Sequence, residues 1–199
     1  MKKLVPAASL LGHLLLCWVL VQGAAGAAEP APLPGDSVLQ IAGTFTDQSN
    51  RTFHLVDRRG TPQLISMFYG SCQSICPLLI ETGAAITHAL SPAERRRLNV
   101  LLVTLDPARD SPKVLAQVAH DHRVDLARWT LARTDQRVVR QLAAALDVRY
   151  RKLESGDFNH TTVWVLLDAN GRMVARTENL TIEPDATFVA AVRSTLRER

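Results

Sequence analysis

Two compact apolar runs, each followed by a helical pattern, place the strongest constraint on how this chain folds. The runs are PQLISMFY (62–69) and RLNVLLVTLDP (97–107). Short apolar stretches bounded by turn residues are typical of buried strands. The segments that follow them, 76–90 and 111–122, begin with Cys-Pro and Ser-Pro, and proline suits the first turn of a helix. Strands that alternate with helices predict a mostly parallel sheet covered on both faces.

The remaining segments extend this pattern at both ends. Residues 40–60 predict a short hairpin with a turn at 48–50. Residues 128–133 indicate a further strand, and 135–148 a helix that is capped by Asp135. Residues 160–178 predict an antiparallel hairpin turned at Asn170-Gly171, and 183–199 a final helix. The expected fold is therefore α/β and compatible with a thioredoxin-like order, with an N-terminal β-hairpin and a late antiparallel hairpin.

The N-terminus has the pattern of an exported protein. Lys2 and Lys3 precede an apolar run, and the small residues GAAGAA follow it. We predict a signal peptide over 1–27, with an uncleaved inner-membrane anchor as the alternative, because residues 4–28 could just span a bilayer. Residues 28–36 form a proline-rich linker, and 37–199 form the domain. The expected location is periplasmic, either soluble or held to the inner membrane by the N-terminal segment alone.

The charge pattern gives no sign of nucleic-acid binding. The chain has a formal net charge of +4, and its basic residues are scattered along the sequence. Arg95, Arg96 and Arg97 follow Pro92 and are predicted to lie in a solvated loop. No basic stripe with interleaved aromatic residues is present, so we expect no nucleic-acid partner.

Cys72 and Cys76 are the two cysteines that remain outside the targeting segment, which contains Cys17. An exported domain permits a disulfide, but a bridge across three residues would restrain little of the unfolded chain. Because Pro77 disfavours a helical conformation at Cys76, we predict that Cys76 is the last residue before the helix and carries the favoured thiolate. Two sulfurs also suit Cu(I) or Zn(II), which usually need a further ligand.

One histidine is better placed than the others to be that ligand. His54 falls in a predicted hairpin strand, and His88 lies about 16 Å along the helix axis from Pro77, too far to reach Cys76. His120 and His122 are two residues apart on a helix and do not face each other. His160 precedes the strand TTVWVLL, and its loop is expected to face the cysteine loop across the edge of the sheet.

Three segments, in this order along the chain, resemble the Sco/SenC family. They are MFYGSCQSICPLL, LLVTLDPARDSPKVL and GDFNHTTVWVLLDANGR. The likeness runs from about residue 45 to 176. Members of that family are exported, thioredoxin-like copper proteins that assist cytochrome c oxidase assembly. The resemblance implies that Cys72, Cys76 and His160 bind copper. It also matches Asp106-Pro107 and Arg109-Asp110, and we take Asp106 as a partner outside the ligand set.

The motif departs from the family pattern in ways that bear on the ion. Family members often carry a proline and an acidic residue between the cysteines, whereas this chain has Gln73, Ser74 and Ile75. They also commonly carry an aspartate before the histidine, whereas this chain has Asn159. Both changes remove negative charge, so we expect Cu(I) to be favoured over Cu(II). They also leave open whether the client is the copper-bearing subunit of the oxidase or another periplasmic copper protein.

The leading interpretation is a copper metallochaperone, a binding protein rather than an enzyme. The alternative is a thiol–disulfide oxidoreductase that keeps client cysteines reduced and is itself served by a thiol reductant; the two can coexist, since the same thiols can do both. A peroxiredoxin is ranked last, because its motif needs threonine and proline where this chain has Tyr69 and Ile65.

Overall fold

The computed structural model describes Lys2 and residues 31–197 of the chain. The predicted signal peptide or anchor therefore lies outside the described residues apart from Lys2, and the predicted linker is described from Ala31. A compact unit begins at Pro32, and its hydrophobic core is drawn from residues between Val38 and Leu196. No helix within the described residues is both long and apolar enough to cross a membrane.

A seven-stranded sheet forms the centre of this unit, in the order β2-β1-β5-β4-β3-β8-β9. β3, β4 and β5 are parallel to one another, while β1 and β8 pair with this centre in the antiparallel sense. The strands are β1 (Phe45–Asp47), β2 (Thr52–Phe53), β3 (Gln63–Phe68), β4 (Asn99–Thr104), β5 (Trp129–Arg133), β8 (Trp164–Leu167) and β9 (Met173–Thr177). The predicted N-terminal hairpin β1–β2, the parallel centre and the late hairpin β8–β9 are confirmed.

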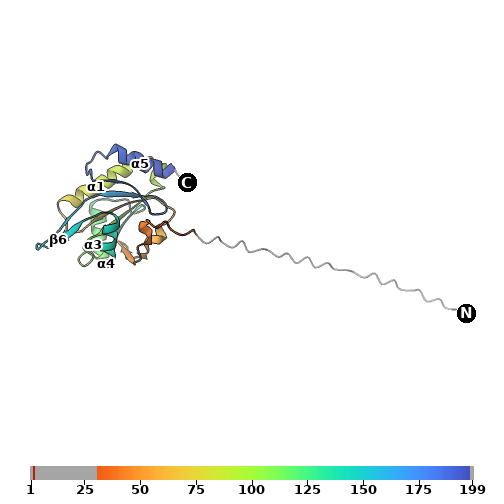
Figure 1. The fold of residues 1–199 in the computed structure, drawn as a ribbon, viewed down its shortest axis with the longest axis horizontal. Coiled ribbons are helices and arrows are strands. Elements are labelled where there is room, and N and C mark those ends of the chain that lie inside the picture. The colour runs from red at the N-terminus through yellow and green to blue at the C-terminus, as the bar shows by residue number, and fades with distance from the viewer. Residues whose placement is uncertain (1, 3–30, 198–199) are drawn as a thin grey trace. The chain divides into compact units, whose positions relative to one another are not determined.

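Helices cover both faces of the sheet. In Figure 1, α1 and α5 lie on one side of the sheet and α3 and α4 on the other. The bounds are α1 (Ile75–His88), α3 (Pro112–Asp121), α4 (Gln136–Ala145) and α5 (Ala186–Arg197). The predicted caps form as expected: Ser111 accepts from the backbone N–H of Val114, and Asp135 accepts from that of Val138. Each cap satisfies a backbone donor that the first helical turn leaves free.

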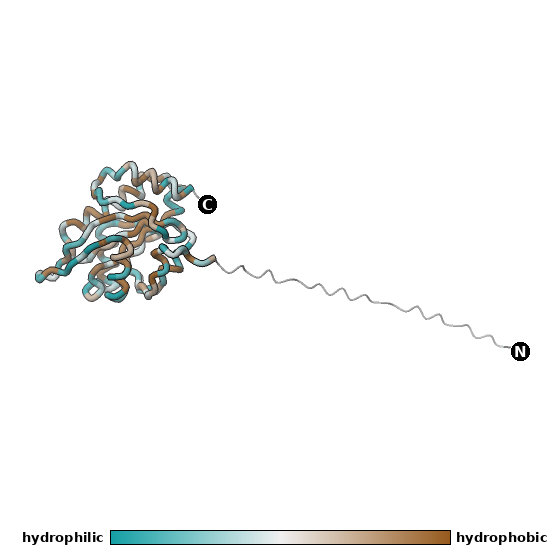
Figure 2. Tube along the Cα trace, in the orientation of Figure 1, coloured by the Kyte–Doolittle hydropathy of each residue, from teal (hydrophilic) through white to brown (hydrophobic). Residues whose placement is uncertain are grey.

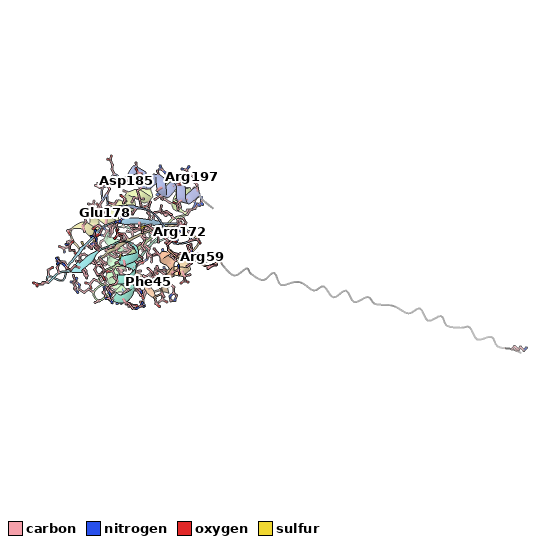
Figure 3. All side chains as sticks on the ribbon, viewed as in Figure 1. Phe45, Arg59, Arg172, Glu178, Asp185 and Arg197 are labelled. Carbon is pink, nitrogen blue, oxygen red and sulfur yellow. The ribbon has the colours of Figure 1, made fainter. Side chains whose placement is uncertain are left out.

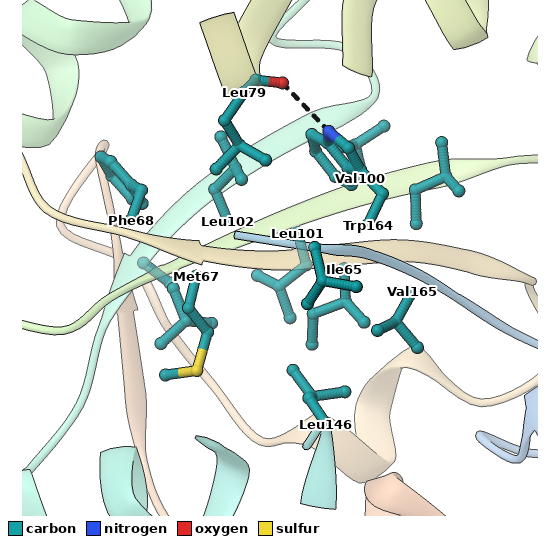
Figure 4. Packing of buried hydrophobic residues seen from close by; sticks show 14 of the residues in the cluster. Ile65, Met67, Phe68, Leu79, Val100, Leu101, Leu102, Leu146, Trp164 and Val165 are labelled. Atoms are coloured by element: carbon teal, nitrogen blue, oxygen red, sulfur yellow. Dashed lines mark hydrogen bonds between the residues drawn. The ribbon is translucent and has the colours of Figure 1, made fainter. Parts of the chain in front are cut away.

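The parallel centre is the most apolar part of the unit. All six residues of β3 are buried, as expected for a strand covered on both faces, and the tube in Figure 2 is predominantly brown there. Trp164 on β8 packs against Trp129 on β5 with their rings at 81°. Its indole N–H donates to the Leu79 carbonyl of α1 at 3.0 Å, as Figure 4 shows. This bond holds α1 against the sheet.

The local structure differs from the prediction in two places. The segment before Arg96 is a short helix, α2 (Pro92–Arg95), because Ser91 and Glu94 form a capping box. The loop before His160 is the turn of an antiparallel hairpin that was not predicted, formed by β6 (Tyr150–Lys152) and β7 (Phe158–His160). Its turn contains Gly156 at φ +89°. Short 3₁₀ helices, η1 (Val38–Gln40) and η2 (Leu55–Arg58), were not anticipated either.

Gly83 provides a test of how tightly α1 packs on the sheet. A Cβ at this position would lie 2.3 Å from Trp164 Cζ2 and 2.8 Å from Trp129 Cη2. We expect Gly83→Ala to lower the free energy of unfolding by about 1–3 kcal/mol, since overpacking forces large side chains to shift. Urea unfolding of Gly35→Ala is the matched control, because a Cβ there would meet nothing within 4 Å. Equal stability of the two variants would contradict this packing.

Candidate metal centre

The loop between β3 and α1 carries both cysteines, and the helix begins earlier than predicted. α1 starts at Ile75, so Cys76 lies in its first turn rather than before it. The avoidance of helical geometry before proline is a preference, and Pro77 is tolerated here because the first N–H groups of a helix have no intrahelical partner. The prediction that Cys76 precedes the helix is therefore wrong.

The sulfur of Cys72 caps this helix. Ser74 stands at the N-cap position but makes no side-chain capping bond. Instead the backbone N–H of Cys76 donates to Cys72 Sγ at 3.3 Å. A helix N-terminus is electropositive and favours a thiolate, so the stabilised sulfur is that of Cys72. Both cysteines are free thiols in this structure.

The two thiols are electrostatically unequal. Burial raises the pKa of Cys72, but hydrogen bonds from the Cys76 thiol and from the backbone N–H groups of Cys76 and Ser74 outweigh it and lower the pKa from 9.0 to about 7. Burial and the neighbouring Cys72 sulfur raise the pKa of Cys76 far above its ordinary value. The sequence-based prediction of a Cys76 thiolate is thus wrong, because Cys76 supplies the hydrogen bonds that Cys72 accepts.

Tyr69 connects the cysteine loop to the β6–β7 hairpin. Its side chain hydrogen-bonds with Cys72 and with the Phe158 backbone, and burial is the main reason that the pKa of Tyr69 is raised to about 12. Its ring centroid lies 5.2 Å from that of Phe158 and 5.9 Å from that of His160, edge-on. Tyr69 therefore stands between the first thiol and the predicted histidine. The sequence did not predict this role of Tyr69, because its contacts with Phe158 and His160 join segments that are far apart in the chain.

His160 is the last residue of β7 and has one nitrogen without a partner. Its Nδ1 lies 3.1 Å from the Thr161 carbonyl oxygen. A carbonyl can only accept, so Nδ1 carries the proton and Nε2 keeps its lone pair. Nε2 is buried and has no hydrogen-bond partner in the described part of the chain, and burial lowers the pKa of the ring, which favours the neutral form. A neutral imidazole with its second nitrogen engaged is the usual state of a metal ligand.

The three predicted ligands are not assembled into one site. Among residue 2 and residues 31–197, no three His, Cys, Asp or Glu side chains lie close enough together to hold a metal ion. Cys72 and Cys76 are joined by a hydrogen bond, whereas His160 contacts the edge of the Tyr69 ring, with the ring centroids 5.9 Å apart. The donor set nevertheless suits a soft ion, because it offers two sulfurs and one imidazole nitrogen that lacks any other partner.

Two aspartates behind the site have different roles. Asp106, predicted as a partner of the ligands, pairs with Arg109, which also donates to the Gly156 carbonyl in the β6–β7 turn. Asp106 is therefore linked through Arg109 to the hairpin that carries His160. Asp110 lies nearer to the cysteines: it accepts from the Gly70 N–H at 2.9 Å and from the Thr104 hydroxyl. Burial raises the pKa of Asp110.

The other four histidines within residues 31–197 lie on elements outside this loop. His54 caps η2 and lies 2.9 Å through Nδ1 from the Gly43 carbonyl oxygen. His88 ends α1, and His120 contacts the neighbouring Asp121. His122 follows the end of α3.

Comparison with known proteins decides the family. A model described as SCO1/SenC matches residues 35–197. The chain belongs to the SCO1/SenC family. An SCO2-like protein of Rickettsia felis is 25% identical over 145 residues, which cover 67% of each chain.

Solved structures of Sco proteins share the fold of this SCO1/SenC chain. Bradyrhizobium japonicum ScoI with copper bound has a TM-score of 0.63 at 22% identity, covering 78% of this chain and 96% of that one. BsSco is described as having a disulfide switch and as a member of the Sco family of cytochrome c oxidase assembly proteins. It has a TM-score of 0.68 at 20% identity, covering 78% and 92%. The thioredoxin-like fold predicted from the sequence is confirmed.

The unequal thiols predict an order of chemical modification. Because the pKa of Cys72 is about 7 and that of Cys76 is raised, Cys72 should be alkylated first, with a rate that rises with pH through a midpoint of about 7. Mass spectrometry after brief iodoacetamide treatment would locate the label. Tyr69→Phe removes a donor to Cys72 and should raise that midpoint, whereas Tyr150→Phe should not. Faster labelling of Cys76 would contradict the assignment.

Proposed function

We propose that this SCO1/SenC protein is a copper metallochaperone that holds Cu(I) through Cys72, Cys76 and His160. The observation that carries the proposal is the buried Nε2 of His160, which has no partner although Nδ1 is engaged. An unsatisfied buried polar atom is costly, and a metal ion would satisfy it. Two sulfurs beside one imidazole favour Cu(I) over Cu(II), and the copper-bound ScoI structure supports copper as the ion.

Binding through all three residues requires the β6–β7 hairpin to approach the cysteine loop. The thiols form one preassembled half of the site, and His160 forms the other half on a separate two-stranded sheet. Tyr69 lies between them and would give up its hydrogen bond to Cys72. The hairpin is exposed around Leu153 and is held to the main unit partly through Arg109, so it is the part of the site most able to move.

A hinged site of this kind suits a protein that transfers its cargo. Copper held partly by a mobile element can be released when that element opens, whereas a fully preformed three-ligand site would retain it. We propose the copper-bearing subunit of cytochrome c oxidase or another periplasmic copper protein as the client. The description of BsSco as a cytochrome c oxidase assembly protein supports the first of these.

The role of His160 predicts a defined loss of binding. His160→Ala should weaken Cu(I) binding by about 10-fold or more, because metal ligands and their supports typically contribute at this level, and should leave the fold intact. Competition with a Cu(I) chelator under anaerobic conditions would measure the affinity, and His88→Ala would serve as the control, since His88 is exposed at the end of α1. Unchanged affinity in His160→Ala would exclude His160 as a ligand.

A second function, thiol–disulfide exchange with a client, is favoured by the inequality of the thiols. A thiol with a pKa near 7, such as Cys72, is well suited to attack a disulfide at neutral pH. The protonated and more buried Cys76 could then resolve the mixed disulfide. The oxidised pair would need a thiol reductant to restore it. The disulfide switch described for BsSco supports this reading.

Oxidation of the thiols should abolish copper binding, since a disulfide offers no thiolate ligand. We expect the reduced domain to bind one Cu(I) and the Cys72–Cys76 disulfide form to bind none, with bound copper protecting both thiols from alkylation. Cys72→Ser and Cys76→Ser should each abolish tight binding with only modest loss of stability. Equal copper affinity before and after oxidation would falsify this coupling and return the pair to a structural role.

We further propose that the domain works in the periplasm, on the grounds of the N-terminal pattern alone. A fusion of residues 1–36 to alkaline phosphatase should be active, because that reporter needs export. Replacing the apolar run's Leu14, Leu15 and Leu16 with aspartate should abolish this activity. Export-independent activity of a cytoplasmic reporter fused at the same point would contradict the location.

A further inference from the structure

Eight arginines gather at one end of the sheet, around three adjoining hollows that share Arg128. They occupy positions 51, 58, 59, 95, 96, 97, 123 and 128, and we call them the arginine face. These residues are scattered along the sequence, and their proximity could not be predicted from it. The fold brings them together from segments that are up to about eighty positions apart.

The topology explains why they meet. The parallel strands β3, β4 and β5 all begin at this end, and each is preceded by arginines of the face. The cysteine loop and Asp106 follow the opposite, carboxyl ends of β3 and β4. Because a six-residue strand spans about 20 Å, the arginine face and the thiols lie at opposite ends of the domain.

The arginine face is strongly and locally positive. Among the described residues, the acidic side chains that line the same three hollows are Asp57 and Asp125. Residues 28–199 carry 21 basic and 19 acidic side chains, so the rest of the domain has a net negative charge. Arg51 pairs with Asp47 and Arg58 donates to Gln63 and Thr130, but the side chains at 95, 96, 97, 123 and 128 have no hydrogen-bond or ion-pair partner in the part of the chain that the structure describes.

The first hollow combines this charge with an apolar floor. Its cavity volume is about 260 Å³, and Leu98, Val100 and Trp129 lie in its lining together with arginines 95, 123 and 128. Apolar surface beneath guanidinium groups suits an amphiphilic anion such as a phospholipid, whose phosphate can accept paired hydrogen bonds from arginine. Trp129 is buried, so no exposed aromatic ring is available there to stack on nucleic-acid bases.

The N-terminal segment joins the domain at this same end. Ser37 donates to the Asn170 carbonyl, and Arg172 pairs with Asp36 at 3.1 Å. In the same β8–β9 turn, Asn170 accepts from Arg59, and Ala169 lines a hollow with Arg96 and Arg97. Figure 3 shows Arg59 and Arg172 at the end where the described chain begins, and Figure 1 shows β6 at the other end.

We propose that the arginine face docks onto a bilayer surface containing anionic phospholipids. Three observations favour this partner over an acidic protein: the local excess of arginine, the apolar floor beneath it, and the point at which the linker enters. A proline-rich segment of nine residues has a reach of about 28 Å at 3.1 Å per residue, so a membrane that held residues 4–28 would keep the face close to its surface. Docking would direct the cysteine loop away from the bilayer, towards a client. Docking of the arginine face does not require copper binding.

Vesicle co-sedimentation of residues 28–199, which contain the whole core, tests the proposal. The domain should bind phosphatidylcholine vesicles that contain phosphatidylglycerol, should not bind pure phosphatidylcholine vesicles, and should dissociate as salt rises. Each arginine near an anionic surface strengthens binding about fivefold. Arg96→Gln/Arg97→Gln/Arg128→Gln should therefore weaken it on the order of 100-fold.

Two matched triple variants complete the design. Lys113→Gln/Arg137→Gln/Arg140→Gln removes the same charge from α3 and α4 and should leave most of the binding. Arg96→Lys/Arg97→Lys/Arg128→Lys keeps the charge and should retain vesicle binding. Copper stoichiometry should be unchanged in every variant, which separates failure here from failure of the proposed function. No binding to anionic vesicles, equal loss in both glutamine triples, or capture by soluble polyglutamate but not by vesicles would overturn the proposal.

Discussion

The hydrogen bond from the Cys76 backbone N–H to Cys72 Sγ organises the functional end of this protein. It replaces the missing N-cap bond of α1, makes Cys72 the stabilised thiolate and leaves Cys76 protonated. The bond depends on the position of α1, which Trp164 fixes from the sheet through Leu79. The inequality of the two thiols is therefore a consequence of how the helix is packed as much as of the cysteine spacing.

The parallel centre of the sheet separates two kinds of chemistry. The segments that follow β3 and β4 contain the two cysteines, Asp106 and Asp110. The segments that precede β3, β4 and β5 contain the arginines. His160 joins the thiol end because β8 runs antiparallel to β3 and begins beside its carboxyl end. One topology thus places the proposed copper site and a basic surface about one strand length apart.

The sequence predicted the sheet, its helices and the candidate ligands because each depends on a local pattern or on motifs kept in order. The sequence did not reveal which cysteine has the lower pKa, because that depends on which sulfur accepts the hydrogen bond from the Cys76 N–H. The β6–β7 hairpin was missed because its strands are short and largely exposed. Tyr69 and Asp110 reach the site through contacts distant in sequence, and the convergence of the arginines likewise appears only in three dimensions.

The central claim is that two sulfurs and the Nε2 of His160 hold one Cu(I). X-ray absorption at the copper edge on the anaerobically loaded domain tests it most directly, because sulfur and nitrogen neighbours scatter differently. The account predicts two sulfur neighbours and one imidazole nitrogen, with the nitrogen contribution lost in His160→Ala. A first shell of sulfur alone, or one that is unchanged in His160→Ala, would contradict it.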